Sequence, residues 1–570
     1  MAFIKTTTNK EGRTHVYLVE GYRIDGKVKQ RILHKFGLLE DLEKAEPDIL
    51  ERLKREAKAG HFDTEKTLEV SYALNTPIAT PDQSYGWMVL DNLFCELGLP
   101  TYLKTIGLGV LTEVLKLLVF QRILQPDSKR ATVQSQADLF GDWQVDLNQV
   151  YRGLTDFDKW KEDIQFHLHK RLTELTNRQA TLVFYDVTNY YFETDLDDQD
   201  EKDEQGTITK LGLRRRGPSK EHRPKPIVQM GLFMDQNGIP ISYQLFRGNQ
   251  VDVSTYLPAI KQVKKQFGIE RIVVVADKGM NSKDNISETL ANKDGWIFSQ
   301  KHRGRRGAPK DIQEQILATE GWHFNATETF AKKSYIRERR LGTKKSAPLI
   351  QEKVLITWNK KYAVREKIRR EGALEYAQKL TNAELYRQTS KKGGKRYLDL
   401  TYLDPETGEI KPYSPLIQLD QEQVDFDAQF DGVNVIITSE IEMSDEAILD
   451  SYSQLSKIED CFRVTKTEFS SRPVYVRTPE HIEGHFLTCF LGLVLIRLLQ
   501  YRTDWQMSPE RMIGALNSAK ATPLKDDYYR LQENQDMSEL NRLLGIDWTK
   551  GIVKYEQLKQ YAKGSYTTPK

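Results

Sequence analysis

Residues Thr181 to Glu193 read TLVFYDVTNYYFE. This stretch is apolar and rich in β-branched and aromatic residues, which predicts one buried strand. Asp186 stands in its middle. An ionised carboxylate inside a buried strand is unfavourable unless it is paired or binds a metal. We therefore predict a functional role for Asp186, since a helix-capping role is not available in mid-strand.

The segments that follow predict how this strand is used. IVQMGLFMD (227–235) and ISYQLFRGN (241–249) read as two further strands in hairpin order. STYLPAIKQVKKQFG (254–268) then reads as a helix, and RIVVVADKGM (271–280) as a buried strand with Asp277 at its tip. This is the element order of a ribonuclease-H-like core, so we predict a mixed α/β protein.

The composition of the 570-residue chain predicts several soluble, globular domains, with 39% hydrophobic and 29% charged residues. The longest apolar stretch, residues 486–499, is interrupted by Arg497 and too short to span a bilayer, so we expect a buried helix and no membrane partner. Cys95, Cys461 and Cys489 lie far apart, which favours a reducing compartment and no structural zinc. We expect a cytoplasmic protein.

Charge is segregated along the chain although the net charge is only +3. Acidic residues gather in 193–204, and basic residues in 213–225, 301–310, 337–345 and 365–370. Such clustering favours a polyanion, here double-stranded DNA, although each cluster alone also fits solvated loop charge. The candidate DNA contacts in these clusters are Lys220, Arg223, Arg303, Arg305 and Arg306.

The N-terminus predicts a β-hairpin. HVYLVEGYRI (15–24) and KVKQRILHKFG (27–37) flank an Asp25-Gly26 turn. Period two would place four cations of the second strand on one face, which could contact DNA or merely protect an exposed edge. They are Lys27, Lys29, Arg31 and Lys35.

YSQLSKIEDCFRVTK, residues 452–466, contains the third candidate carboxylate. Read as one helix, it places five residues on one face. They are Tyr452, Leu455, Glu459, Arg463 and Lys466. The alternative is an amphipathic surface helix with an ion pair between Glu459 and Arg463.

Three carboxylates from separate elements suit phosphodiester chemistry. Cleavage and strand transfer need an activated water or hydroxyl and a stabilised leaving oxygen, which two Mg²⁺ ions about 3.5–4 Å apart provide. We expect Asp186 and Asp277 on neighbouring strands, with Glu459 on a helix beside them, to hold two Mg²⁺ or Mn²⁺ ions. The alternative for Asp277 is a helix cap at the strand end.

The chain resembles the bacterial insertion-sequence DDE transposases that share a Y-(2)-R-(3)-E-(6)-K signature. The signature falls here on Tyr452, Leu455, Glu459 and Lys466. DVTNYYFE, GIPISYQLFRGNQVDVSTYLP, VVVADKGMNS and IEDCFRVTKTEFSSRPVYVRTPEHIEGHFLTCFLGL also resemble one branch of that group. The resemblance extends over residues 181–499.

The resemblance implies a ribonuclease-H-like catalytic domain interrupted by a β-rich insertion. It implies a homodimer that pairs inverted-repeat ends in a synaptic complex, cleaves them and transfers the 3′-hydroxyl into target DNA, by cut-and-paste with end hairpins. The signature Tyr, Arg and Lys would hold phosphates of the transposon end. Leu455 cannot do so, and we expect Arg463 to replace it beside Tyr452 and Lys466.

An insertion-domain tryptophan stacks on a flipped base in related hairpin-forming transposases. Trp322 and Trp358 are candidates here, with Trp358 preferred, whereas Trp296 precedes the insertion. The alternative for each of them is a place in the hydrophobic core. His481 and His485 stand four apart on the expected helix of residues 478–499, and we expect a structural or phosphate-contacting role for them.

The expected organisation has six parts. An N-terminal hairpin with a charged helix (1–75) precedes a helical DNA-binding region (76–178) and the first part of the core (179–300). A β-rich basic insertion (301–445), closing core helices (446–505) and a helical C-terminal region suited to dimerisation (506–570) follow. We expect a transposase that acts at the bacterial nucleoid. Two alternatives are a ribonuclease-H-like nuclease without strand transfer and a catalytically inactive DNA-binding regulator.

Overall fold

The computed structural model describes residues 2–24, 27–59, 81–218, 224–304, 308–342, 347–379, 397–401, 416–532, 534–546 and 551–561. The chain divides into two compact units, Met1–Ile78 and Ala79–Lys570.

The first unit is a three-stranded antiparallel sheet with two helices. Its elements are β1 (Ala2–Thr8), β2 (Thr14–Ile24), β3 (Lys27–Leu38), α1 (Leu39–Ala45) and α2 (Ile49–Ala59). The predicted hairpin strands β2 and β3 pair, and β1 adds a strand at the edge of β2; the turn residues 25–26 lie outside the described residues. Val16, Ile49 and Leu53 form a small core.

The prediction of a single basic face on β3 was wrong. β3 has two irregularities in its register with β2, so Arg31 pairs with Glu20 whereas Lys35 pairs with Tyr17. Since Glu20 and Tyr17 are three residues apart on β2, they point to opposite faces, and Lys35 therefore faces away from Arg31. The Arg31 guanidinium is also ion-paired with Glu20 at 2.6 Å.

Five strands of the second unit form the predicted ribonuclease-H-like arrangement. They are β5 (Leu182–Tyr191), β8 (Ile227–Met234), β9 (Pro240–Arg247), β10 (Val273–Ala276) and β11 (Gly295–Ser299). Their order in the sheet is β9-β8-β5-β10-β11. The β5, β8 and β9 strands are antiparallel, and β10 runs parallel to both β5 and β11. The strands are mostly apolar because both faces of the sheet are covered.

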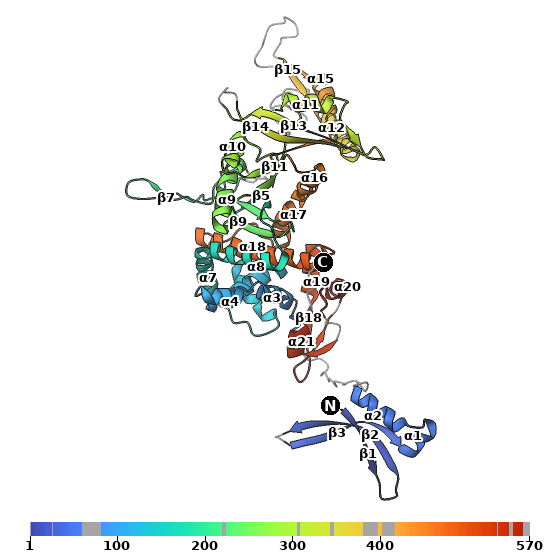
Figure 1. Ribbon diagram of the computed structural model, residues 1–570. Coiled ribbons are helices and arrows are strands. Elements are labelled where there is room, and N and C mark those ends of the chain that lie inside the picture. Colours follow the sequence, from blue (N-terminus) through green and yellow to red (C-terminus); the bar gives the residue numbers. More distant parts are fainter. Residues whose placement is uncertain are drawn as a thin grey trace. The chain divides into compact units, whose positions relative to one another are not determined.

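Helices cover the two faces of this sheet (Figure 1). They are α9 (Asp252–Phe267) and α10 (Lys283–Ala291) on one face, and α16 (Asp445–Ser453), α17 (Leu455–Arg463) and α18 (Pro479–Arg502) on the other. The side chains of α9 and α10 share a core with one face of β5, β10 and β11. Those of α17 and α18 belong to the larger core on the opposite face.

The residues expected to form the insertion extend the ribonuclease-H-like sheet. β17 (Val433–Thr438) pairs with β11 and continues through β14 (Leu349–Asn359) and β13 (Phe330–Arg340) to β12 (His323–Phe324). The result is one nine-stranded sheet. The other elements of this part are α11 (Lys310–Leu317), α12 (Lys360–Lys379), β15 (Leu398–Thr401), β16 (Leu416–Leu419) and α15 (Gln421–Ala428).

The predicted helical region packs around α18. Its elements are α3 (Trp87–Glu96), α4 (Leu99–Thr105), η1 (Gly109–Leu111), α5 (Thr112–Leu124), α6 (Lys129–Gln134), η2 (Ser135–Asp138), α7 (Leu147–Lys159) and α8 (Lys161–Thr176). Figure 1 shows α18 between the sheet and α7, whereas α8 contacts both α18 and β9. By length and composition α18 could cross a membrane, but 94% of its most apolar window is buried within the protein, as in a core helix.

The prediction of a helical C-terminal region was wrong in part. The region contains α19 (Pro509–Ser518), β18 (Lys520–Pro523), β19 (Tyr528–Leu531), α20 (Gln535–Leu544), β20 (Ile552–Lys554) and α21 (Tyr555–Tyr561). Its three strands form a small sheet with β4 (Gln83–Ser84), in the order β20-β19-β18-β4. Strands of three or four residues leave too short a pattern to read in the sequence.

Candidate active site

The register of β5 and β10 brings Asp186 and Asp277 side by side. The parallel pairing of these strands ends with Val275 beside Phe184, and two further residues in the same register reach the two aspartates. Neighbouring strands are about 4.8 Å apart, and residues in register point to the same face. Phe184 and Val275 belong to the core beneath α17 and α18. Both carboxylates therefore face that side of the sheet.

The turn after β10 holds Asp277. The backbone N–H of Gly279 donates to Asp277 Oδ1 at 2.7 Å, and a Cβ at Gly279 would lie only 2.8 Å from the same oxygen. The following helix, α10, is capped by Ser282, whose side chain accepts from the backbone N–H of Asn285. Asp277 is thus not the cap of α10, and its exposed carboxylate is available for another role.

Glu459 is presented by α17, the helix that packs against β5. Ile458, Cys461 and Phe462 bury one face of α17 in the larger core, which leaves Glu459 exposed. Among the described residues, Glu459 has no ion-pair partner.

The Tyr452 phenol, at the end of α16, lies within the electrostatic influence of both Asp277 and Glu459. Burial raises the pKa of Tyr452, a hydrogen bond with the Ser299 side chain opposes this shift, and the charges of Asp277 and Glu459 add to it. Both carboxylates therefore act on one phenol. Within the residues that the structure describes, no three His, Cys, Asp or Glu side chains come close enough together to hold a metal ion. Asp186, Asp277 and Glu459 therefore do not form a closed three-carboxylate cluster.

The predicted single helical face over residues 452–466 was wrong. A turn at Gln454 separates α16 from α17, and α17 passes into a π-helix, η3 (Val464–Glu468). The wider π turn shifts Lys466 from the row that a regular α-helix would give. Leu455 packs against the larger core, which suits the apolar residue at the position where the signature has arginine.

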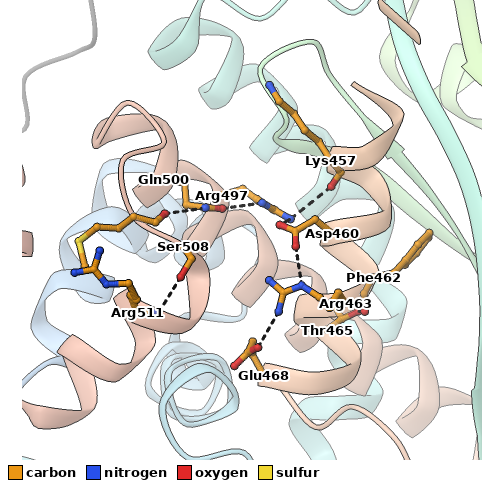
Figure 2. A network of polar contacts seen from close by, with 11 residues as sticks. Lys457, Asp460, Phe462, Arg463, Thr465, Glu468, Arg497, Gln500, Ser508 and Arg511 are labelled. Atoms are coloured by element: carbon orange, nitrogen blue, oxygen red, sulfur yellow. Dashed lines mark hydrogen bonds and ion pairs between the residues drawn. The ribbon is translucent and has the colours of Figure 1, made fainter. Parts of the chain in front are cut away.

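A polar network fixes α17 to α18 (Figure 2). Arg497, only 1% exposed, donates to Asp460 Oδ2 at 2.8 Å and to Gln500 Oε1 at 2.7 Å. Arg497 also reaches the carbonyl oxygen of Lys457 at 3.5 Å. Sequence reasoning missed this role, although the arginine that interrupts an apolar stretch was its signal. The network holds the residue next to Glu459.

Arg463 and Lys466 both have partners within the protein. Arg463 donates to Asp460 Oδ1 at 2.8 Å and to Glu468 Oε1 at 3.2 Å, as Figure 2 shows. The Lys466 ammonium lies 5.5 Å from the centre of the Tyr190 ring. A phosphate that binds Arg463 would have to compete with two carboxylates.

Much of the segregated charge is neutralised in space. The acidic segment lies against the first basic segment, where Asp198 pairs with Arg214 and Asp200 pairs with Arg215 and Arg247. The hairpin β6 (Glu201–Lys202) and β7 (Ile208–Lys210) lies between them.

The basic segments of the insertion are paired as well. Arg337 and Arg339 share the buried carboxylate of Glu352, and Arg303 pairs with Glu366. Arg303 therefore does not carry a free charge. Four other predicted DNA contacts lie outside the described residues: Lys220, Arg223, Arg305 and Arg306.

Trp358 and Trp322 line one aromatic cavity of about 230 Å³ with Phe324. The residues that lie in register with Asp277 on the neighbouring strands β11, β17 and β14 end with Leu355. Trp358, three residues further along β14, points to the opposite face. The aromatic cavity therefore belongs to the core opposite the carboxylates. Trp296 is fully buried on β11, where no base can stack on it.

Two family models match the chain. The IS1634 family transposase N-terminal domain matches residues 4–67, and the transposase DDE domain matches residues 207–495, which is just over half of the chain. The chain belongs to the insertion-sequence DDE transposases. This transposase is accordingly a DNA-cleaving and strand-transferring enzyme of a family that acts with divalent metal ions. The matched range contains Asp277 and Glu459 but begins after Asp186. The assignment of Asp186 to the candidate site therefore depends on its strand register with Asp277.

Solved transposase structures also resemble the transposase. A piggyBac transposase synaptic complex with hairpin DNA is 8% identical, with coverage of 71% of this chain and 69% of that chain and a TM-score of 0.33. A Mos1 transposase paired-end complex with the left transposon end is 12% identical, with coverage of 45% and 70% and a TM-score of 0.14. These scores are too low to add to the family assignment. No curated protein matches the chain.

Proposed function

We propose that Asp186, Asp277 and Glu459 are the catalytic, metal-binding residues of this transposase. The observation that carries the proposal is the register of β5 and β10, which sets two carboxylates in one row on the face that α17 covers. The shared influence of Asp277 and Glu459 on Tyr452 supports a site that includes the third carboxylate.

The donor set fits Mg²⁺ or Mn²⁺. Its donors are carboxylate oxygens, which hard divalent ions prefer, and few protein ligands suffice for Mg²⁺ because it retains water. Asp186 and Asp277 would hold an ion between neighbouring strands, and Glu459 would complete the site from α17. Two such ions activate the attacking water or hydroxyl and stabilise the leaving oxygen.

The proposed reaction begins with hydrolysis at the inverted-repeat ends of an insertion sequence. The freed 3′-hydroxyl then attacks a phosphodiester of target DNA, by a cut-and-paste route with end hairpins. A homodimer that pairs two ends in one synaptic complex would carry out both steps, at the bacterial nucleoid in the cytoplasm. Trp358 is the proposed stacking platform for a flipped base, which would have to reach the face opposite the carboxylates.

The cleaved strand is held by Tyr452, Arg463 and Lys466. Of these three residues, Tyr452 is the one whose pKa is raised by the charges of Asp277 and Glu459. Arg463 is exposed enough to exchange a carboxylate for a phosphate, which a guanidinium can bind through two hydrogen bonds.

The test uses DNA that carries the inverted repeats flanking the gene, incubated with Mg²⁺ and the full-length protein. We expect cleavage at the repeat boundary followed by joining to target DNA. Asp186→Asn and Asp277→Asn should each lose both steps while end binding persists, because the fold and the DNA-binding surface remain.

Asp284→Asn is the matched control, since Asp284 is an exposed acid on α10 beyond the site. It should cleave like the natural protein. Cleavage without joining would indicate a nuclease, and binding alone, unchanged in Asp186→Asn, would indicate a regulator. Either result would refute the proposed mechanism.

A further inference from the structure

A basic cavity lies away from the carboxylate row, where three distant segments of the chain meet. Its volume is about 220 Å³. It is formed by the end of α5 and the loop to α6, by the loop after η3, and by α18. Its basic lining residues are Arg122, Lys129, Arg472 and His485.

Two of these cations, Arg122 and Lys129, are buried without an acidic partner among the described residues. Arg122 and Lys129 are each only 6% exposed, and neither forms an ion pair with a carboxylate of the described residues. Arg122 donates to the carbonyl oxygens of Phe469 and Asp127 at 3.1 and 2.9 Å, and its Nε has no hydrogen-bond partner. Two buried, unpaired cations this close are unfavourable in the absence of an anion.

Lys129 and His485 show the consequence of this crowding. Lys129 Nζ lies 3.4 Å from His485 Nδ1. Burial, together with the Arg122 charge, lowers the pKa of Lys129 to about 7. Burial, with the charges of Lys129 and Arg122, holds the pKa of His485 well below its usual value. A bound anion would remove this repulsion and restore the full charge of Lys129.

One carboxylate also lines the cavity. Asp127 is exposed, and its Oδ1 accepts a hydrogen bond from the backbone N–H of Ser128 at 2.5 Å. It opposes the charges of Arg122, Lys129 and Arg472, so the lining retains a net positive charge. The hydroxyls of Ser128 and Ser470 add polar groups at the mouth.

We propose that this cavity binds a phosphate group of the DNA backbone. Arg122 connects the cavity to the segment that carries Glu459. Its guanidinium donates to the carbonyl oxygen of Phe469, the residue directly after η3. The cavity can receive one phosphate but not a duplex, so it would fix a single backbone position of a bound strand. The inference rests on the proposed function only in taking DNA as the source of the phosphate.

The test compares Lys129→Met with Lys104→Met in the full-length protein. Lys104 is an exposed lysine in the last turn of α4, so its loss changes the net charge equally without touching the cavity. For duplex DNA without added metal, Lys129→Met should raise Kd about five- to tenfold for every sequence and lower the slope of log K against log salt by about 0.9. Lys104→Met should change neither quantity appreciably.

Inorganic phosphate is the second probe. It should raise the Tm of the natural protein and of Lys104→Met but not that of Lys129→Met. Stabilisation by phosphate with unchanged DNA binding would assign the cavity to a free anion and overturn the proposal. Equal DNA losses in both lysine variants, or no response to either probe, would overturn it as well.

The outcome is separable from that of the proposed function. DNA binding is measured without cleavage, so the cavity can pass its test even if Asp186→Asn still cleaves. A Lys129→Gln variant guards against misfolding, because it keeps a polar side chain in the cavity. It should lose the phosphate response while its Tm stays near that of the natural protein.

Discussion

The three proposed catalytic carboxylates are positioned in two different ways. Backbone register sets the positions of Asp186 and Asp277 on neighbouring strands, and the N–H of Gly279 holds the Asp277 carboxylate. Glu459 reaches the site from a helix and is exposed. Its position depends on how α17 packs.

Glu459→Gln should abolish cleavage while end binding remains. The amide keeps the size of the side chain but loses the negative charge that a divalent ion needs. A fall of at least about a hundredfold in the rate of end cleavage is expected, since loss of a metal-orienting group costs on that order. End binding by mobility shift serves as the control. Cleavage at the natural rate would exclude Glu459 from the metal site.

Lys129→Met should stabilise the DNA-free protein by about 1–4 kcal/mol at pH 7, because an apolar side chain replaces a buried, unpaired cation. Since the folded pKa of Lys129 is about 7, below its usual 10.5, the unfolded chain binds more protons between these values. The penalty is therefore complete below pH 7 and disappears as the pH rises toward 10.5.

The measurement is the difference in Tm between Lys129→Met and the natural protein from pH 6 to pH 10. The groups around Lys129 are Arg122 on α5, Asp127 and Arg472 on the loops, and His485 and Cys489 on α18. A difference that stays constant over this range would show that Lys129 is charged throughout.

At the scale of elements, α17 is held by two different kinds of contact. Apolar residues of one face pack on β5, and the buried guanidinium of Arg497 grips Asp460. Because Asp460 directly follows Glu459, the same ion pair that joins two helices also sets the position of the third carboxylate. Arg497 is a positioning residue in this sense.

Arg497→Met should destabilise the protein by about 3 kcal/mol, because Asp460 loses its buried partner. Burial opposes ionisation of Asp460, but the Arg497 charge and hydrogen bond, helped by Arg463, lower the pKa of Asp460 below its usual value. The stabilisation is therefore present above about pH 4 and is lost as the pH falls further. Urea unfolding at pH 7 and at pH 3 checks this.

A positioning role adds a second readout. Cleavage by Arg497→Met should require more Mg²⁺ than cleavage by the natural protein, whereas a purely structural residue would change stability alone. Arg497→Lys, which retains a positive charge, should recover part of the Mg²⁺ affinity.

At the scale of the whole molecule, the chain combines a small N-terminal unit with a large one built around a nine-stranded sheet. Among the described residues, the core cluster of the small unit has three buried members, Val16, Ile49 and Leu53. The large unit extends its catalytic sheet through β17, β14, β13 and β12, so a displacement of the insertion strands must strain the same sheet that holds Asp186 and Asp277.

Leu53→Ala should unfold the N-terminal unit selectively. Truncation of a buried leucine costs about 2–5 kcal/mol, which a core of this size cannot absorb. Hydrogen exchange should rise throughout residues 2–59 and stay unchanged in β5 and β10. Global exchange across both units would show that they fold as one.

The ribonuclease-H-like order of strands and a buried helix, expected at residues 478–499 and found at Pro479–Arg502, could be read from the sequence alone, because local periodicity is visible one segment at a time. The sequence also nominated Asp186, Asp277 and Glu459, in part because an acid in an apolar strand is unfavourable without a role, and their catalytic role stays a prediction. The sequence could not show that the acidic and basic segments neutralise each other, that a π-helix displaces Lys466, or that bulges turn Lys35 away. It also gave no sign that Arg122 and Lys129 meet Arg472 and His485 in one cavity. Only the tertiary structure decided these points, because each depends on segments far apart in the chain or on a small departure from regular geometry.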